Sequence, residues 1–102
     1  MTDAPELLFH PNFDQRAEDE AETRGTVFDV QVRIGNAVYL VTFVTPARMA
    51  SELELVASQG TPWIGEAALI VVPRIKREAL QRAVDAIAQS GDFFTRLIPE
   101  PA

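Results

Sequence analysis

The stretch GTVFDVQVRIGNAVYLVTFVTP, residues 25–46, predicts a β-hairpin that runs directly into a helix. Apolar and polar residues alternate from Phe28 to Ile34, the period of two expected of a strand with one buried and one wet face. Gly35-Asn36 then supplies a two-residue turn of type II′, because glycine takes φ > 0 at no steric cost. The rest of the chain is therefore arranged around a hairpin over residues 26–45.

Folding about this turn fixes the expected register of the hairpin. Four apolar pairs then share one face of the sheet: Phe28 with Phe43, Val30 with Val41, Val32 with Tyr39, and Ile34 with Ala37. Thr45-Pro46 ends the second strand, because threonine is a good helix N-cap and proline has no N–H to lose at the first helical position.

The remaining segments alternate between helix and strand patterns. Residues 46–58 and about 75–90 place apolar side chains at helical spacing, which predicts two amphipathic helices. Residues 66–72 are apolar and rich in β-branched side chains, as in a buried strand, and residues 6–10 are short and apolar enough to add an edge strand. We expect one α+β domain over 1–102, a mainly antiparallel sheet with both helices on one face.

Two segments hold candidate partner-binding residues. Residues 14–22 carry five acids against one arginine, and a solvated loop or frayed helical turn is the favoured interpretation, with an acidic docking surface as the alternative. Trp63 lies in a loop, and its favoured role is that of a lid over the end of the core, with an exposed binding anchor as the alternative. The candidate partner-binding residues are Asp14, Glu18, Asp19, Glu20, Glu22 and Trp63.

Composition narrows the class of partner and the compartment. A net charge of -6 and a pI near 4.6 argue against nucleic acid and suit a basic protein partner. The chain has no cysteine, no apolar run of membrane-spanning length and no secretion signal at its amino terminus, so we expect a cytoplasmic protein that does not enter a membrane.

Catalytic and metal-binding patterns are missing from the sequence. His10 is the lone histidine and has no cysteine to activate, and one histidine without cysteine does not make a structural zinc site. The acidic pairs do not share a helix face in a persuasive acid–base dyad, and the five glycines form no phosphate-binding loop. We therefore expect no enzyme activity, no metal and no cofactor.

The order of segments resembles a known family. The chain has, in order, a run ending in a turn (LLFHPNFD), an acidic linker, a strand ending in Ile-Gly (VFDVQVRIG), a strand ending in Thr-Pro (YLVTFVTP), a helix, an apolar strand (ALIVV) and a final helix. This order looks like that of the eighth numbered family of bacterial polymorphic-toxin immunity proteins. The resemblance covers roughly residues 7–90. It implies a protein that binds and neutralises the C-terminal domain of a cognate toxin. We expect the chain itself to be a monomer or a weak homodimer.

Two other functions fit a small acidic α+β chain. A secretion chaperone or adaptor would typically dimerise and hold an unfolded client. A small ligand-binding domain of the ferredoxin-like kind would need a strand after its last helix, and the sequence offers no clear strand there.

Overall fold

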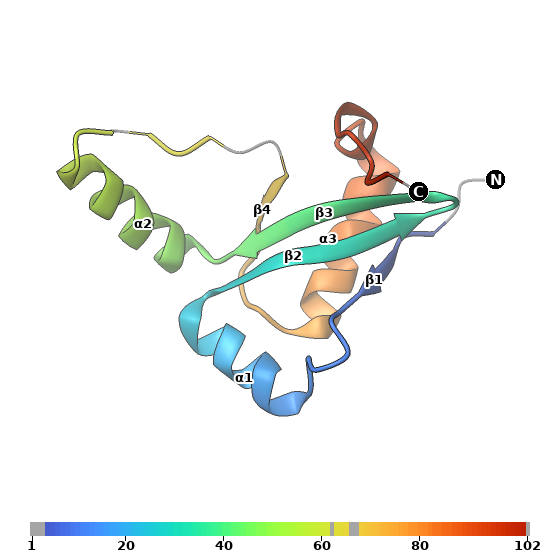
Figure 1. Cartoon of the computed structure of the whole chain (residues 1–102), viewed down its shortest axis with the longest axis horizontal. Coiled ribbons are helices and arrows are strands. Elements are labelled where there is room, and N and C mark those ends of the chain that lie inside the picture. Colours follow the sequence, from blue (N-terminus) through green and yellow to red (C-terminus); the bar gives the residue numbers. More distant parts are fainter. Residues whose placement is uncertain (1–3, 62, 66–67, 102) are drawn as a thin grey trace.

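The computed structural model describes residues 4–61, 63–65 and 68–101 of the chain. Its elements are β1 (Glu6–Leu8), α1 (Gln15–Arg24), β2 (Thr26–Ile34), β3 (Ala37–Val44), α2 (Pro46–Ser58), β4 (Leu69–Val71), α3 (Arg77–Ser90) and the 3-10 turn η1 (Phe94–Arg96). The sheet has the order β1-β2-β3-β4 and is antiparallel except for its last pair (Figure 1). The predicted α+β fold with a mainly antiparallel sheet is confirmed.

The β2–β3 hairpin has the predicted turn and most of the predicted register. Gly35 has a φ of 60° at the first turn position, as a type II′ turn requires. Three of the four expected pairs are present: Val30 with Val41, Val32 with Tyr39, and Ile34 with Ala37. The fourth pair is wrong, because Phe43 lies opposite Val27 and not opposite Phe28.

A β-bulge between Val27 and Val30 causes this shift. Phe28 and Asp29 together lie opposite the single residue Thr42, and Asp29 has a φ of 55°, a left-handed conformation uncommon outside glycine. The extra residue leaves Val27 packed against the core and turns Phe28 to the other face of the sheet, where it is 59% exposed. The side chain that the alternating pattern assigns to the core is therefore on the surface.

Both edge strands of the sheet are short. β1 pairs with β2 through Leu7 opposite Val32, which confirms an edge strand within residues 6–10. β4 runs parallel to β3 with Ile70 opposite Phe43. The strand predicted over 66–72 is present over 69–71, while 66 and 67 lie outside the described residues. Because parallel neighbours need a crossover connection, α2 with the chain that follows it forms that crossover.

α3 is the helix that covers the sheet. Its residues Leu80 and Val84 join Val32 and Phe43 in one buried cluster, and Figure 1 shows the helix behind the hairpin. The helix begins at Arg77, two residues later than predicted, because Lys76 is still extended with a φ of -139° and a ψ of 140°.

α2 has the predicted bounds but lies outside the helix layer. Thr45 caps it as expected, its Oγ1 accepting a hydrogen bond from the backbone N–H of Arg48 at 3.3 Å. No residue of α2, all of which the structure describes, is buried, and the helix extends beyond the end of β3 (Figure 1). The prediction that both helices cover one face is therefore wrong, because α3 covers that face and α2 does not. On the other face Phe28 and Val71 are exposed, whereas Val44, just before α2, is buried.

A tight corner at Gly25 fixes the direction of α2. The backbone N–H of Thr45 donates to the carbonyl of Gly25 at 2.8 Å, and the same threonine caps the helix. One residue therefore joins strand to helix, which is shorter than the usual two to six and leaves α2 no room to turn back over the sheet. A Cβ at Gly25 would lie 2.6 Å from Thr45 Oγ1 and 2.9 Å from Arg48 Cβ.

We predict that Gly25→Ala destabilises the fold more than an otherwise similar change. Gly25 combines a φ of 77° with this close approach, so the variant should lose about 2–3 kcal/mol of unfolding free energy. Gly60→Ala is the matched control, because Gly60 has a φ of 91° and no described atom within 4 Å of the added Cβ, and it should lose about 1 kcal/mol. Urea unfolding followed by circular dichroism measures both, and equal losses would contradict the steric role of the corner.

Candidate functional site

The acidic stretch 14–22 folds as the greater part of helix α1. Asp14 is its N-cap, with Oδ1 accepting from the backbone N–H of Ala17 at 2.9 Å, and Gly25 closes the helix in the left-handed conformation. The favoured interpretation of a loop or frayed turn is therefore wrong. The sequence did hold the signal, because aspartate is a preferred N-cap and glycine a preferred residue after the last turn.

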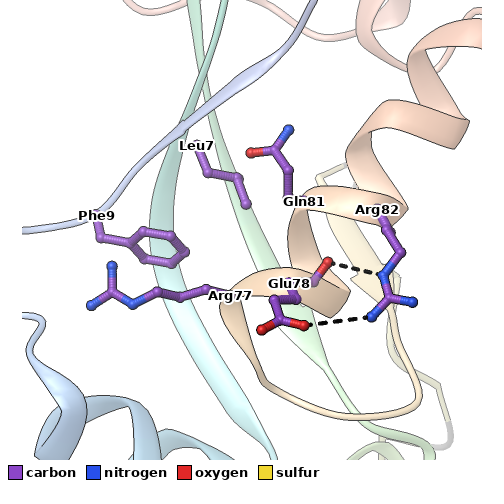
Figure 2. Close-up of a pocket in the computed structure, with 6 residues that line it drawn as sticks. All are labelled: Leu7, Phe9, Arg77, Glu78, Gln81 and Arg82. Carbon is purple, nitrogen blue, oxygen red and sulfur yellow. Dashed lines mark hydrogen bonds and ion pairs between the residues drawn. The ribbon is translucent and has the colours of Figure 1, made fainter.

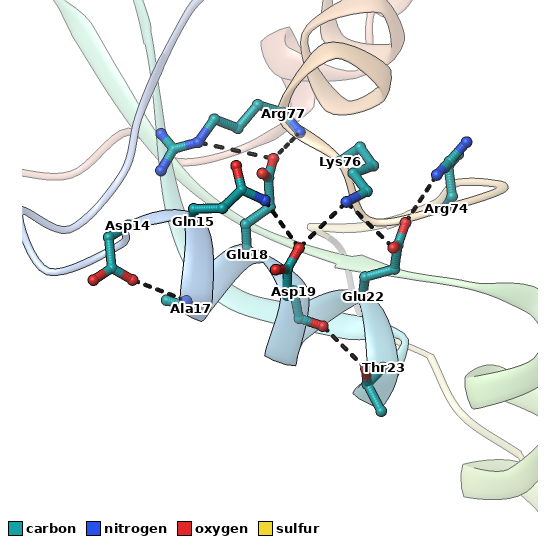
Figure 3. A network of polar contacts seen from close by, with 10 residues as sticks. All are labelled: Asp14, Gln15, Ala17, Glu18, Asp19, Glu22, Thr23, Arg74, Lys76 and Arg77. Carbon is teal, nitrogen blue, oxygen red and sulfur yellow. Dashed lines mark hydrogen bonds and ion pairs between the residues drawn. The ribbon is translucent and has the colours of Figure 1, made fainter.

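Three acids of α1 face a basic segment before and at the start of α3, as Figure 3 shows. Glu22 lies 3.2 Å from Arg74 and 3.3 Å from Lys76 Nζ, and Asp19 lies 3.5 Å from Lys76 Nζ. The hydrogen bond to Glu22, with help from Asp19, raises the pKa of Lys76 above its usual value. Lys76 therefore stays charged at neutral pH, and these acids hold α1 against α3.

Glu18 is the most deeply placed of the five acids, at 7% exposure. Its Oε2 accepts a hydrogen bond of 2.7 Å from the backbone N–H of Arg77, the first residue of α3, and lies 3.8 Å from Arg77 Nε. The N-cap residue Lys76 makes no capping bond with its own side chain within the described structure. Glu18 thus supplies the cap of α3 from a different helix, where a carboxylate also suits the helix dipole.

The two remaining candidate acids, Asp14 and Glu20, make different contacts. Asp14 is engaged in capping α1, whereas Glu20 is exposed and pairs only locally, with Arg16 at 3.3 Å. Exposed pairs of this kind contribute little to stability. Of the five acids predicted to bind a partner, Glu20 is the one that neither caps a helix nor pairs with a cation outside α1.

A shallow pocket of about 700 Å³ lies between β1 and α3 (Figure 2). Its lining residues are Leu7, Phe9, Arg77, Glu78, Gln81 and Arg82. The polar ones already have partners within the chain: Arg77 donates to the carbonyl of Phe13, Gln81 donates to the carbonyl of Pro5 at 3.0 Å, and Arg82 pairs with Glu78. The pocket lies where the amino-terminal segment meets α3. Its polar side chains form the hydrogen bonds and the ion pair described above.

Two phenylalanines strengthen the same contact. The rings of Phe9 and Phe13 stack with centres 4.8 Å apart, and Arg77 Cζ lies 4.8 Å from the centre of each. A guanidinium this close to an aromatic ring is attracted by the negative face of the ring. Arg77 therefore joins α1, the amino-terminal segment and α3, a role that the sequence alone did not indicate.

Trp63 is 64% exposed, so its favoured interpretation as a lid over the core is wrong. It lies in the segment that follows α2, and α2 carries the chain away from the hairpin (Figure 1). An added Cβ at Gly65 would lie 3.2 Å from Trp63 Cζ3, so the ring rests against the backbone of its own loop. Trp63 as an exposed binding anchor stays a prediction.

The sheet face away from α3, here called the open face, carries neighbouring apolar side chains. The register places Phe28 beside Thr42, Thr42 beside Leu69, and Val44 beside Val71, which is 54% exposed. The exposed apolar side chains of the adjoining α2 and its loop are Leu53, Leu55 and Trp63. Apolar residues that gather in this way mark interaction sites more often than scattered ones do.

In comparisons with models of known protein families, with curated proteins and with solved structures, the chain has no significant match. Within the described residues, no helix is both long enough and apolar enough to cross a bilayer. The same part of the chain contains no group of three or more histidine or acidic side chains arranged to hold a metal ion.

We predict that Glu18 is far more important for stability than Glu20. Glu18→Ala leaves the first N–H of α3 without its acceptor and should lower the unfolding free energy by about 2–3 kcal/mol. Glu20→Ala, the matched control on the same helix, should change it by less than about 0.5 kcal/mol. Thermal and urea unfolding measure the difference, and a Glu18→Ala variant as stable as the control would remove the capping role.

Proposed function

We propose that the chain is an immunity protein that binds a toxin domain in the bacterial cytoplasm and neutralises it by direct contact. The observation that supports this best is the set of exposed apolar side chains on α2, the Trp63 loop and the open face. Tryptophan and phenylalanine are frequent energetic centres of protein interfaces. A folded chain that leaves such residues in water has a surface suited to a protein partner.

Charge supports a basic toxin domain as that partner. The chain has a net charge of -6, which speeds encounter with a basic surface through long-range attraction. Glu18, Asp19 and Glu22 are engaged by cations of the chain itself, so Glu20 is the acid of α1 that we expect to face the partner. The order of segments that resembles an immunity family points to the same function.

A secretion chaperone or adaptor is the second candidate, and the position of α2 favours it. A helix that extends from the fold with no buried residue suits a protein that dimerises and holds a client. The two functions differ in what they bind, since an immunity protein has one folded partner and a chaperone several unfolded ones.

The deciding experiment is mass spectrometry of what a tagged copy retains from the lysate of its source cell. We expect one stoichiometric partner, the C-terminal fragment of a large secreted protein, which kills cells when expressed alone and does not when this chain is co-expressed. Recovery of several unrelated clients would support the chaperone instead. A partner whose toxicity this chain fails to suppress would overturn the immunity proposal.

We predict that Trp63→Ala weakens binding to that toxin domain by about 10- to 100-fold, the loss typical of an aromatic anchor at an interface centre. The melting temperature should not change, because Trp63 is already 64% exposed. Ile98→Ala is the control, because Ile98 is 93% exposed near the carboxyl end and lies outside the proposed surface. Calorimetry with the purified pair measures both variants, and equal affinities would exclude Trp63 from the interface.

A further inference from the structure

Each copy of the chain carries two partly exposed apolar surfaces, one on a helix and one on the sheet, which could pack against each other as the two sides of a helix–sheet interface. One is the open face, with Phe28 on β2 and with Leu69 and Val71 on β4, on either side of β3. The other is a stripe on α2, where Met49, Leu53 and Val56 recur at the three- and four-residue spacing that places them on one side of a helix. A crossover helix ordinarily covers the sheet it connects, and here it does not.

The chain cannot close these two surfaces on each other. Thr45 is bound to Gly25 in the ladder and caps α2 at the same time, so the helix starts where the strand ends. Gly25 packs directly against Thr45 and Arg48, which holds the first turn of α2 in its outward direction. The open face of one copy therefore remains available to a helix from elsewhere.

We propose that a second copy of the chain provides that helix. In a two-fold dimer, α2 of each copy lies on the open face of the other, so both surfaces of both copies are covered by one symmetric contact. Charged side chains beside the two surfaces form ion pairs within the chain, Arg48 with Glu52 at 2.8 Å and Arg33 with Glu6. On the open face, Asp29 has no ion-pair partner in the described residues. Glu54 on α2 likewise has no ion-pair partner within the part of the chain that the structure describes, so repulsion between two acidic chains weakens the contact.

The size of α2 sets the strength expected of this dimer. A helix of 13 residues is about 20 Å long, and a contact about 10 Å wide along it covers about 200 Å² on each of the two surfaces, so two such contacts bury on the order of 800 Å² in total. That area is below the roughly 1,200 Å² at which specific protein interfaces begin, so we expect a weak dimer with a dissociation constant on the order of 100 µM.

This inference does not rest on the proposed function, because it concerns the chain alone. If a toxin domain also uses α2, the partner and the second copy compete for it. Partner binding would then be tighter at low concentrations of the chain than at high ones.

Sedimentation velocity over about 10–500 µM, a range that brackets a dissociation constant on the order of 100 µM, tests the dimer directly. We expect a concentration-dependent dimer that Leu53→Ser or Val71→Ser weakens at least tenfold. Leu55→Ser is the matched control, because Leu55 is 58% exposed against 40% for Leu53 but lies on the opposite side of α2 from the stripe, and the variant should dimerise as the unchanged chain does. A monomer throughout the concentration range would overturn the proposal.

The absence of cysteine in the chain allows a second test that does not depend on stability. Leu53→Cys and Val71→Cys chains of different tag length, mixed and mildly oxidised, should form a disulfide between them, whereas Leu55→Cys and Val71→Cys chains should not. A chain that carries both Leu53→Cys and Val71→Cys should cross-link only between copies. A disulfide within one chain would show that α2 folds onto its own sheet and would overturn the proposal.

Discussion

The single residue between β3 and α2 is the constraint on which the arrangement of this chain depends. Thr45 ends the β-ladder against Gly25 and caps α2 in the same position, so strand and helix meet without a loop. A longer connection would let α2 settle on the sheet and bury its stripe. With one residue, the helix is held outside the layer, and part of its own apolar side and part of the open face remain exposed. The exposed surface is thus a consequence of backbone geometry and not of a poor hydrophobic pattern.

The opposite side of the sheet is organised by charge as well as by packing. Glu18 on α1 caps α3, and the side chain of Arg77 on α3 contacts Glu18 and the stacked rings of Phe9 and Phe13. Most acids of a run that looks like a solvated surface therefore make contacts within the chain. Because Asp19 and Glu22 are matched by Arg74 and Lys76, their field at a distance is reduced, and attraction of a basic partner relies on the net charge of the whole chain.

Elements with local signals could be predicted from the sequence, whereas features set by distant contacts could not. Thr45-Pro46 and Gln59-Gly60 gave the bounds of α2, and Gly35-Asn36 gave the hairpin and most of its register. The bulge was missed because Phe28 keeps the alternation that a regular strand would show. The exposure of Trp63 was missed because it depends on where α2 points, which is decided by contacts at Gly25, some 40 residues earlier in the chain. The basic segment 74–77 was a usable signal for the partner of α1, since its charges complement the acids of residues 14–22.

The exposed side chains also set a hierarchy between self-association and partner binding. Burying one large apolar side chain contributes about 1.5–3 kcal/mol, while association costs roughly 4–15 kcal/mol in lost freedom, so a contact made only by the α2 stripe and the open face is weak. Trp63 lies beyond that contact, on the loop after α2, and a toxin domain that covers it together with α2 gains binding energy that a second copy does not. Opposite charge adds a faster encounter, which two copies of an acidic chain lack. A weak dimer can therefore cover the apolar surface when no partner is present, and it dissociates when the proposed partner binds that surface.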